Sequence, residues 1–564
     1  MSYSRKSSRK RAPASTQTVV WLVGGVFGLL ALCCGCWLTF APVAQQVTQQ
    51  TAPPKAVELT IAYSPEKADL FKALVADFNA QNPKALDGTR LSVKTVELEP
   101  DAMAAGAVAG NFQAMSPDSS VWLGQVDRAW ADAHNGEGAL VGATTRYAVS
   151  PVVIAMWRDV AQSMGYPTKP LGWSDLLAKA QSDKNFKWSH PSTASASGLL
   201  ATLAEFYAGA NKTRGLTVED VQAQRTLDYV GAIEKTVRYY GEGEWPIAQR
   251  VVQQGRGYLD AFVCSEQIVI WARGKGADLV AIYPAEGALW QDHPLALLEQ
   301  PGLSDTQRLT FARFSDFVRS PEAQKKVLAL GYRPADLDIP LNSPGSPIRA
   351  DNGVDPAQPK TSLQVPAPAV LQTVQQTWWL TKRRANVMLV VDTSGSMQGD
   401  KIANVKQALK IFVEQIQNDQ ERVGMALFST QVYRTLPPKE LRTSRPVLDS
   451  TIDSIQASGN TALLDGVRVA YDQLQALKDK ERINAIVVMT DGLENNSSVT
   501  LDRLSKYMRD SNQSGVPVAV FAIAYGKDAD YKTLQSLADS TGGQVREGNL
   551  DTIRQLYKIL STYF

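Results

Sequence analysis

The feature that most constrains the fold of this chain is an apolar run, residues 387–391, that ends abruptly in an Asp-x-Ser-x-Ser motif made of Asp392, Ser394 and Ser396. A β-branched, wholly apolar run is typical of a buried parallel strand that is hydrophobic on both faces. Polar residues at the carboxyl end of such a strand stand where open α/β sheets place their ligands. One carboxylate and two hydroxyls are hard oxygen donors, so the motif predicts a site for Mg²⁺ or another hard divalent cation.

Two further oxygen donors follow in positions that suit the same site. Thr461 precedes a helical stretch, and Asp491 directly follows another apolar run, residues 486–490. Strand and helix patterns alternate here, with strands at 387–391, 422–428, 485–490 and 516–524, helices at 401–416, 463–477, 501–511, 531–541 and 550–564, and a short edge strand near 544–545. This alternation predicts an α/β domain with a doubly wound, mainly parallel sheet covered by helices on both faces.

The combination resembles the metal-ion-dependent adhesion site of von Willebrand factor A (VWA) domains, and the resemblance extends over residues 385–564. It implies that Ser394, Ser396 and Thr461 coordinate the ion directly, whereas Asp392 and Asp491 act mostly through bound water. The implied cofactor is Mg²⁺, or alternatively Mn²⁺ or Ca²⁺, with one octahedral position left open for a Glu or Asp of a protein partner. On the simpler alternative, the serines only cap a helix start by accepting hydrogen bonds from backbone N–H groups.

The amino-terminal segment predicts a membrane anchor. All the charges of residues 1–18 are basic, and no charge occurs from Thr18 to Thr51. The apolar stretch 19–41 is long enough to cross a bilayer as a helix. The positive-inside rule then puts the basic tail, residues 1–18, in the cytoplasm and the body outside, either extracellular or periplasmic. The alternatives are a cleaved signal peptide and, from Cys33, Cys34 and Cys36, a lipoprotein.

Charge and cysteine usage exclude other classes. The formal net charge of the whole chain is only +2, and its excess of basic residues lies in the tail, so the body gives no electrostatic reason to expect nucleic-acid binding. Cys264 is the only cysteine of that body and cannot form an intramolecular disulfide there. His134, His190 and His293 are widely spaced and match no Cys/His zinc pattern.

Residues 341–384 separate the two folded parts. Prolines recur between Pro344 and Pro368, which predicts a semi-extended spacer or a strap. Residues 369–384 then show helical spacing, and we expect Trp378 and Trp379 on this helix to pack against one of the two domains.

The middle part, residues 55–340, alternates short strands with amphipathic helices. Strand patterns occur at 58–63, 91–98, 119–123, 146–157 and 278–284, and a helix at 67–81. This order resembles extracellular solute-binding proteins of bacterial importers, as do Trp173-Ser174-Asp175-Leu176-Leu177 and the ending Gly331-Tyr332-Arg333-Pro334. The resemblance implies a two-lobed, periplasmic-binding-protein-like (type II) domain in which residues 146–157 cross between the lobes.

Small hydroxyl side chains mark the expected solute site. Helix starts rich in such residues can hold anions or polar solutes through free N–H groups. The candidates lie at helix starts and strand ends, with one tyrosine at the expected hinge: Ser64, Ser119, Ser120, Ser150, Thr193, Ser195, Ser197 and Tyr283. The same serines could equally cap helices and turns, because no charge pattern points to a particular ligand.

The sequence therefore predicts a cell-surface binding protein. Its VWA domain would engage an acidic protein ligand through a divalent cation, and its solute-binding-like domain would serve as a sensor or scaffold. The alternative is a membrane-tethered solute receptor for import or sensing, with the VWA domain as a docking module. A metal-dependent hydrolase is the third class. Since no nucleophile–base pair and no phosphate-binding loop accompany Asp392 and Asp491, we predict that the chain is not an enzyme.

Overall fold

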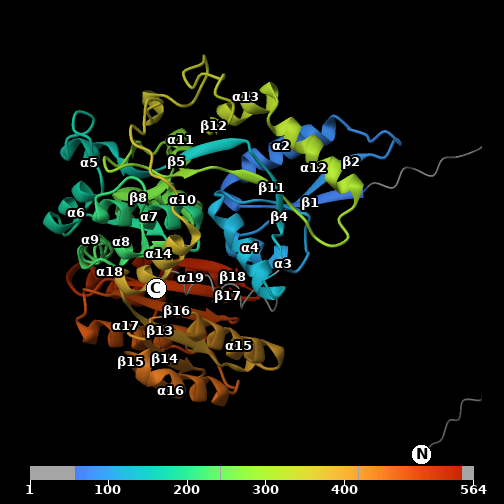
Figure 1. Cartoon of the computed structure of the whole chain (residues 1–564). Coiled ribbons are helices and arrows are strands. Elements are labelled where there is room, and N and C mark those ends of the chain that lie inside the picture. The colour runs from blue at the N-terminus through green and yellow to red at the C-terminus, as the bar shows by residue number, and fades with distance from the viewer. Residues whose placement is uncertain (1–56, 137, 242, 417, 527, 549–564) are drawn as a thin grey trace, which may run out of the picture.

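The computed structural model describes residues 57–548 apart from positions 137, 242, 417 and 527. The basic tail (1–18), the anchor (19–41) and the final helix (550–564) expected from the sequence lie outside the described residues. Within those residues, none of the helices is both long and apolar enough to span a membrane. Figure 1 shows a two-lobed middle domain next to a separate C-terminal domain.

The first lobe of the middle domain is built on a mixed sheet. In the described chain its strand order is β2-β1-β3-β11-β4, with β1 parallel to β2 and β3, and β11 antiparallel to β3 and β4. Apolar side chains such as Leu59, Phe71 and Phe314 form its core. Its elements are β1 (Val57–Tyr63), η2 (Pro65–Lys67), α2 (Ala68–Ala80), β2 (Leu91–Glu97), α3 (Pro100–Val108), β3 (Ala114–Ser116), α4 (Val121–Ala133), β4 (Val141–Arg146), β11 (Pro294–Leu298), α12 (Asp305–Val318) and α13 (Pro321–Ala329).

The second lobe has its own sheet, in which the described strands run β10-β5-β8-β6-β7 and β9 and β12 also pair with β5. The chain passes from the first lobe to the second at the buried residue Tyr147, between β4 and β5. Its elements are β5 (Ala148–Trp157), α5 (Arg158–Ser163), α6 (Trp173–Ser182), β6 (Trp188–Pro191), α7 (Ala196–Ala210), α8 (Val218–Gln222), α9 (Gln224–Glu234), β7 (Tyr240–Gly241), α10 (Glu244–Gln254), η3 (Gly255–Gly257), β8 (Ala261–Ser265), α11 (Glu266–Gly274), β9 (Leu279–Ile282), β10 (Trp290–Gln291) and β12 (Arg333–Pro334).

One strand predicted for the middle domain is absent, so that prediction is wrong. Residues 119–123 are not a strand but the turn and first residues of α4. Val121, Trp122, Leu123 and Val126 are all buried, so the apolar face repeats with the helical period. Three consecutive apolar residues after two serines fit either structure, and only the later Val126 distinguishes them.

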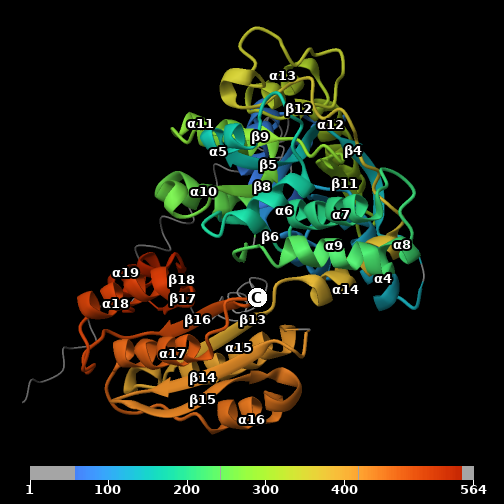
Figure 2. The same ribbon diagram turned by 90° about the vertical axis from the view of Figure 1, so that its left-hand side faces the viewer.

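The proline-rich segment is a strap on the second lobe. The amide of Ala281 donates to the carbonyl of Gly353 at 2.7 Å, and the amide of Leu363 donates to that of Ala288 at 2.9 Å. Ile348 and Val354 are buried. After the strap, which includes η4 (Ala350–Asn352), α14 (Pro368–Thr381) packs against α7, α8 and α9. Figure 2 shows α14 at the boundary between the second lobe and the C-terminal domain.

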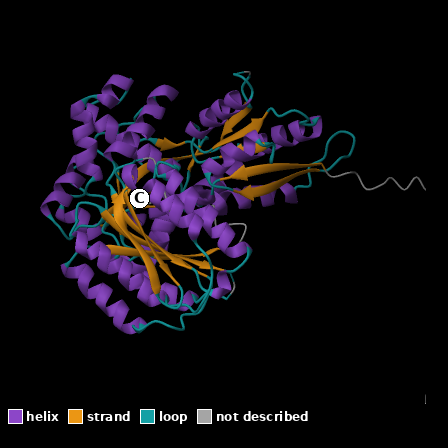
Figure 3. Ribbon diagram, turned by 90° about the horizontal axis from the view of Figure 1, so that it is seen from below, coloured by secondary structure: helices purple, strands orange, loops and turns teal. Residues whose placement is uncertain are grey.

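The C-terminal domain is a sheet between two helical layers (Figure 3). Within the described residues the strand order is β15-β14-β13-β16-β17-β18, and every neighbouring pair is parallel except β14–β15. Its elements are β13 (Ala385–Asp392), η5 (Gly395–Met397), α15 (Asp400–Gln415), β14 (Arg422–Phe428), β15 (Val432–Glu440), α16 (Leu441–Ser454), α17 (Leu463–Leu477), β16 (Ile483–Thr490), α18 (Leu501–Ser514), β17 (Val518–Tyr525), α19 (Tyr531–Thr541) and β18 (Gln544–Gly548).

Side chains of β13 alternate between the two helical layers. Val387 and Leu389 belong to the apolar cluster that includes α15 and α16, whereas Met388 and Val390 belong to the cluster formed with α17, α18 and α19. A strand that is buried on both faces must be apolar throughout, as residues 387–391 are. The predicted α/β class is confirmed. The sequence pattern did not predict β15 or α16.

The two domains are joined by contacts as well as by the chain. The apolar cluster of the second lobe continues through α14 to the α15–α16 face of the C-terminal domain. At the junction the guanidinium of Arg383 donates to the carbonyl of Val237, at 2.7 Å, and to that of Lys480, also at 2.7 Å. Arg383 therefore bonds both domains at once.

Candidate functional site

The candidate site lies at the carboxyl edge of the C-terminal sheet. It contains four residues at strand ends or in the loops that follow them, and a threonine just before a helix. Asp392 ends β13, and Asp491 directly follows β16. These strands are parallel neighbours, with Val391 paired to Met489, so their carboxyl ends lie side by side. Ser394 and Ser396 follow in the loop and short helix after β13. The structure thus brings together the residues that the sequence predicted for the metal site.

Hydrogen bonds connect the motif from end to end. Oδ1 of Asp392 accepts from the amide of Ser394 at 2.8 Å, and its Oδ2 accepts from the hydroxyl of Thr490. The hydroxyls of Ser394 and Ser396 lie 3.0 Å apart. Ser396 in turn donates to Oδ1 of Asp491 at 2.6 Å. Asp392, Ser394 and Asp491 are buried, whereas Ser396 is exposed, so this polar network opens to solvent at Ser396.

Thr461 lies beside the same network. A Cβ added at Gly492 would lie 3.4 Å from Oγ of Ser396 and 3.4 Å from Oγ1 of Thr461, so both hydroxyls face this glycine. The amide of Thr461 donates to Oδ1 of Asn495 at 3.0 Å, and its carbonyl accepts from the amide of Asn495 at 3.1 Å. This reciprocal pair fixes the loop that carries Thr461 against the loop that follows Asp491.

Burial changes the acidity of the first carboxylate. Desolvation raises the pKa of Asp392, and the nearby Asp491 carboxylate adds to that rise, while hydrogen bonds from Thr490 and Ser394 oppose it. Two close carboxylates, one raised in pKa by burial, favour a cation between them.

The predicted solute residues occupy the boundary between the lobes only in part. Ser64 directly follows β1 and is fully buried, with a hydroxyl that has no hydrogen-bond partner. Ser120 donates its amide to Oδ1 of Asp292 at 2.7 Å, and the hydroxyl of Ser119 accepts weakly from the amide of Val121 at 3.4 Å. Ser150, in β5, donates to Gln267.

The remaining candidates have structural contacts. Ser195 caps α7 by accepting from the amide of Gly198 at 3.1 Å, as the capping alternative requires. Thr193 and Ser197 are buried at the same helix start, and Ser197 interacts with Glu244. Tyr283 donates to Glu266 and accepts from the amide of Asp355 at 3.0 Å, which ties the strap to α11.

Charged residues that the sequence analysis did not single out lie at the lobe boundary. In the first lobe, Nζ of Lys67 is fully buried and lies 3.5 Å from Oδ1 of Asp118 and 3.5 Å from Nδ1 of His293. In the second lobe, Glu244 accepts from the amide of Ser265 at 2.9 Å. The lobes touch here, because a Cβ at Gly243 would lie 2.8 Å from Oε1 of Glu66.

Burial shifts the pKa of several ionisable groups at the lobe boundary. Burial, and then Asp118 and other carboxylates including Glu244, raise the pKa of Glu66 well above its ordinary value. Burial raises the pKa of Glu244 to about 7 and lowers that of Lys67 to about 8. Burial and the Lys67 charge lower the pKa of His293, so its imidazole is neutral. Buried atoms without a hydrogen-bond partner gather here: Ser64 Oγ, Glu66 Oε2, Asp118 Oδ1, Gln267 Nε2, Gln291 Oε1 and His293 Nε2.

Two family models match the parts of the chain that these sites occupy. Residues 59–333 match the model of bacterial extracellular solute-binding proteins, and residues 386–558 match that of the von Willebrand factor type A domain. The chain joins a solute-binding domain to a VWA domain. Both families are typically non-enzymatic binding modules, so the assignment supports a binding or docking role.

Curated relatives share parts of this architecture. The chain is 26% identical over 182 residues to inter-alpha-trypsin inhibitor heavy chain H2 of Mus musculus, a match that covers 31% of this chain and 19% of the relative. It is also 26% identical over 282 residues to an uncharacterized protein of Mycobacterium tuberculosis, which covers 48% of this chain and 40% of the relative. The chain thus spans well under half the length of either relative.

Solved structures resemble each domain separately. The sulfate-binding protein of Mycobacterium tuberculosis aligns with 50% of this chain and 88% of its own, at 18% identity and a TM-score of 0.37. A von Willebrand factor type A protein from Catenulispora acidiphila aligns with 32% of this chain and 42% of its own, at 19% identity and a TM-score of 0.28.

The residues at the VWA sheet edge fit a hard divalent cation. The five predicted ligands offer only oxygen, as two carboxylates and three hydroxyls. The hydroxyls of Ser394 and Ser396 bond each other, and Ser396 bonds Asp491, so each keeps a lone pair for an ion. Ser394, Ser396 and Thr461 would hold the ion, and Asp392 and Asp491 would balance its charge. A bound Mg²⁺ would supply an electrophilic position for an incoming carboxylate.

Two residues of the VWA site escaped the sequence analysis. The ammonium of Lys401, from the first turn of α15, forms an ion pair with Oδ2 of Asp491. The hydroxyl of Thr490 orients Asp392 from the neighbouring strand. Thr490 could have been found, because it is the last residue of β16 and immediately precedes Asp491. Lys401 carried no distinguishing signal, since one lysine on an amphipathic helix is usually a solvated side chain.

Proposed function

We propose that this protein is a cell-surface binding protein whose VWA domain engages an acidic side chain of a protein partner through Mg²⁺, or through Mn²⁺ or Ca²⁺. The solute-binding domain would act as a ligand sensor or scaffold. The observation that carries the proposal is the convergence of Asp392, Ser394, Ser396 and Asp491 in one hydrogen-bonded network, with Thr461 beside it.

The shape of the network favours a role in binding. Its carboxylates are buried, so they can balance the charge of an ion without offering themselves to a partner. Its exposed member, Ser396, marks the side from which a partner would approach. Mg²⁺ retains exchangeable waters in such sites, and a carboxylate is the hard oxygen ligand best suited to replace one.

We further propose that the body stands outside the cell on a single membrane helix. The support is the uncharged stretch 19–41, preceded by basic residues alone. In that arrangement residues 1–18 stay in the cytoplasm, and both binding domains face the extracellular or periplasmic space.

The test is capture of partners from a cell-surface extract with the full chain as bait. Capture should require Mg²⁺, should fail in EDTA, and should fail for Asp491→Ala. The matched control is Asp453→Ala, which removes an exposed carboxylate of the same domain that pairs with Lys410. If the wild type, Asp491→Ala and Asp453→Ala all capture the partner in EDTA, the contact does not depend on a metal ion.

A second candidate function, capture of a small solute, is supported by the unpartnered polar atoms at the lobe boundary. Buried polar groups without partners are costly, so they favour a bound molecule that satisfies them. Glu66 and Asp118 lie close to Lys67, and Glu244 lies close to Glu66. These three carboxyl groups outnumber the one ammonium among them, which favours a cationic solute over an oxyanion. Spermidine should raise the unfolding temperature of the full chain, and sulfate or molybdate should not. The opposite result would reject a cationic solute.

A further inference from the structure

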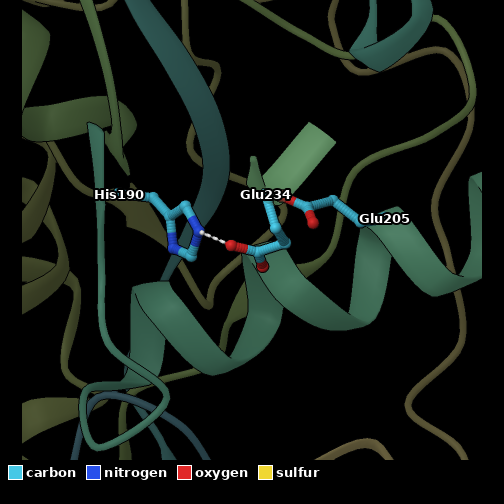
Figure 4. Close-up of side chains that lie close together, drawn as sticks. All are labelled: His190, Glu205 and Glu234. Atoms are coloured by element: carbon cyan, nitrogen blue, oxygen red, sulfur yellow. Dashed lines mark hydrogen bonds and ion pairs between the residues drawn. The ribbon is translucent and has the colours of Figure 1, made fainter. Parts of the chain in front are cut away.

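A second group of possible metal ligands lies outside the VWA domain, inside the second lobe. His190 comes from β6, Glu205 from α7 and Glu234 from α9 (Figure 4). One ligand atom from each residue lies within 4.8 Å of the others. All three side chains are fully buried. Because these residues come from three separate elements, the sequence shows no metal-binding pattern that includes them.

The histidine presents a defined nitrogen to the group. Its Nδ1 lies 2.7 Å from the carbonyl oxygen of Pro191. A carbonyl only accepts hydrogen bonds, so Nδ1 carries the hydrogen and Nε2 faces Glu234. Metal-binding histidines typically donate their other nitrogen to a carbonyl or carboxylate in this way.

Among the described residues Glu205 has no ion pair, whereas Glu234 lies within ion-pair distance of His190. Both carboxylate oxygens of Glu205 are buried without a hydrogen-bond donor. Lys382, which directly follows α14, pairs with Glu421 instead, at 3.3 Å. Neighbouring buried carboxylates require either a shared proton or a metal ion.

The spacing also suits a tetrahedral ion. Nε2 of His190 lies 3.3 Å from Oε2 of Glu234. In a tetrahedron with metal–ligand bonds of about 2.0–2.1 Å, neighbouring ligand atoms stand about 3.3–3.4 Å apart. One oxygen of Glu205 lies within 4.8 Å of the other two ligand atoms, so a rotation of its side chain would complete a three-residue site.

We propose that His190, Glu205 and Glu234 bind a divalent transition-metal ion, Zn²⁺ in the first instance, and that this ion fastens the VWA domain to the solute-binding domain. Imidazole nitrogen favours Zn²⁺, whereas the all-oxygen VWA site favours Mg²⁺. The inference does not depend on the proposed function.

The connection between the two domains runs through hydrogen bonds that Glu234 accepts. Its Oε1 accepts from Nε1 of Trp378, on α14, at 2.8 Å, and its Oε2 accepts from the hydroxyl of Tyr240 at 2.7 Å. The same tyrosine oxygen accepts from the amide of Arg383 at 2.7 Å. Arg383 enters the VWA domain and bonds Lys480 there. An ion that holds Glu234 therefore orders the path between the two domains.

Zinc content measures the site directly. Asp392→Ala in the full chain removes the hard-cation site, and this protein is stripped with EDTA, refilled with ZnCl₂ and freed of unbound metal. It should retain about one Zn²⁺ per chain, and the double variant Asp392→Ala/Glu205→Gln about a tenth of that or less. Asp392→Ala/Glu219→Gln, which changes an exposed glutamate, is the matched control and should retain zinc. No retained zinc in Asp392→Ala, or equal zinc in all three proteins, would overturn the proposal.

A spectroscopic readout covers the case in which Glu205→Gln does not fold. Co²⁺ loaded into the Asp392→Ala chain should give the strong visible bands of a tetrahedral site, and Zn²⁺ should abolish them. The same Zn²⁺ should raise the unfolding temperature, since it binds only the folded chain. Absent visible bands would show that protons, rather than a metal, hold the two glutamates together.

Discussion

The indole Nε1 of Trp378 donates a hydrogen bond of 2.8 Å to Oε1 of Glu234, and this bond fixes the last helix before the VWA domain to the interior of the solute-binding domain. Both side chains are fully buried. The helix is therefore a structural part of the solute-binding domain, and the orientation of the VWA domain depends on it.

Trp378→Phe should lower the free energy of unfolding by about 1–3 kcal/mol. The substitution removes the indole N–H donor and leaves Oε1 of Glu234 buried without that hydrogen bond. The measurement is the unfolding midpoint of the full chain. Trp379→Phe is the control, since Trp379 is only half-buried, and its backbone carbonyl bond to Asn418 is unaffected. Equal losses for the two variants would show that the Glu234 bond contributes little.

Lys401→Met should tighten Mg²⁺ binding about three- to tenfold, because the ammonium competes with the ion for Asp491. The affinity is measured by calorimetric titration. Lys410→Met is a matched control on the same helix, since Lys410 pairs with the exposed Asp453 instead. Weaker Mg²⁺ binding in Lys401→Met would mean that the lysine supports the site.

Thr490→Val should weaken Mg²⁺ binding about tenfold while leaving the fold intact, because valine keeps the shape of threonine but cannot orient Asp392. Thr490→Ser, which keeps the hydroxyl, should restore most of the affinity. If both variants bind Mg²⁺ as the wild type does, the Thr490 hydroxyl has no role in positioning Asp392.

Glu244→Gln should flatten the dependence of stability on pH between about 4.5 and 7. Burial raises the pKa of Glu244 from 4.5 to about 7. In this window the folded chain holds a proton that the unfolded chain has released, so stability falls as pH rises and stays low above pH 7. The contribution is about 3 kcal/mol at most. Unfolding midpoints at pH 5 and pH 8 measure it, with Glu219→Gln as control. An unchanged slope in Glu244→Gln would contradict the assignment.

Much of the VWA domain could be predicted because its signals are local. The runs at 387–391 and 422–428 are apolar enough to identify buried parallel strands, and the acidic and hydroxyl residues stand next to their ends. The strand β15 was missed, since it is a half-exposed edge strand that contains Pro437 and Pro438. Edge strands bury little surface and tolerate proline, so their pattern is weak.

The remaining features depend on contacts between distant residues. The prolines at 344–368 favoured a spacer as much as a strap, and the burial of residues such as Leu363 on the second lobe decided for the strap. The group of His190, Glu205 and Glu234 comes from three separate elements, so no spacing rule could have indicated it. The charges at the lobe boundary were also hidden, because Lys67 and Glu244 contact buried residues that are distant in the sequence, such as Asp118 and Ser265.

The most direct test of the central claim is calorimetric titration of Mg²⁺ into the full chain and its Asp392→Ala variant, with Asp453→Ala as control. We expect one Mg²⁺ site in the wild type and in Asp453→Ala, and no detectable binding in Asp392→Ala, whose fold is verified by circular dichroism. An Asp392→Ala protein that binds Mg²⁺ with wild-type affinity would contradict the account.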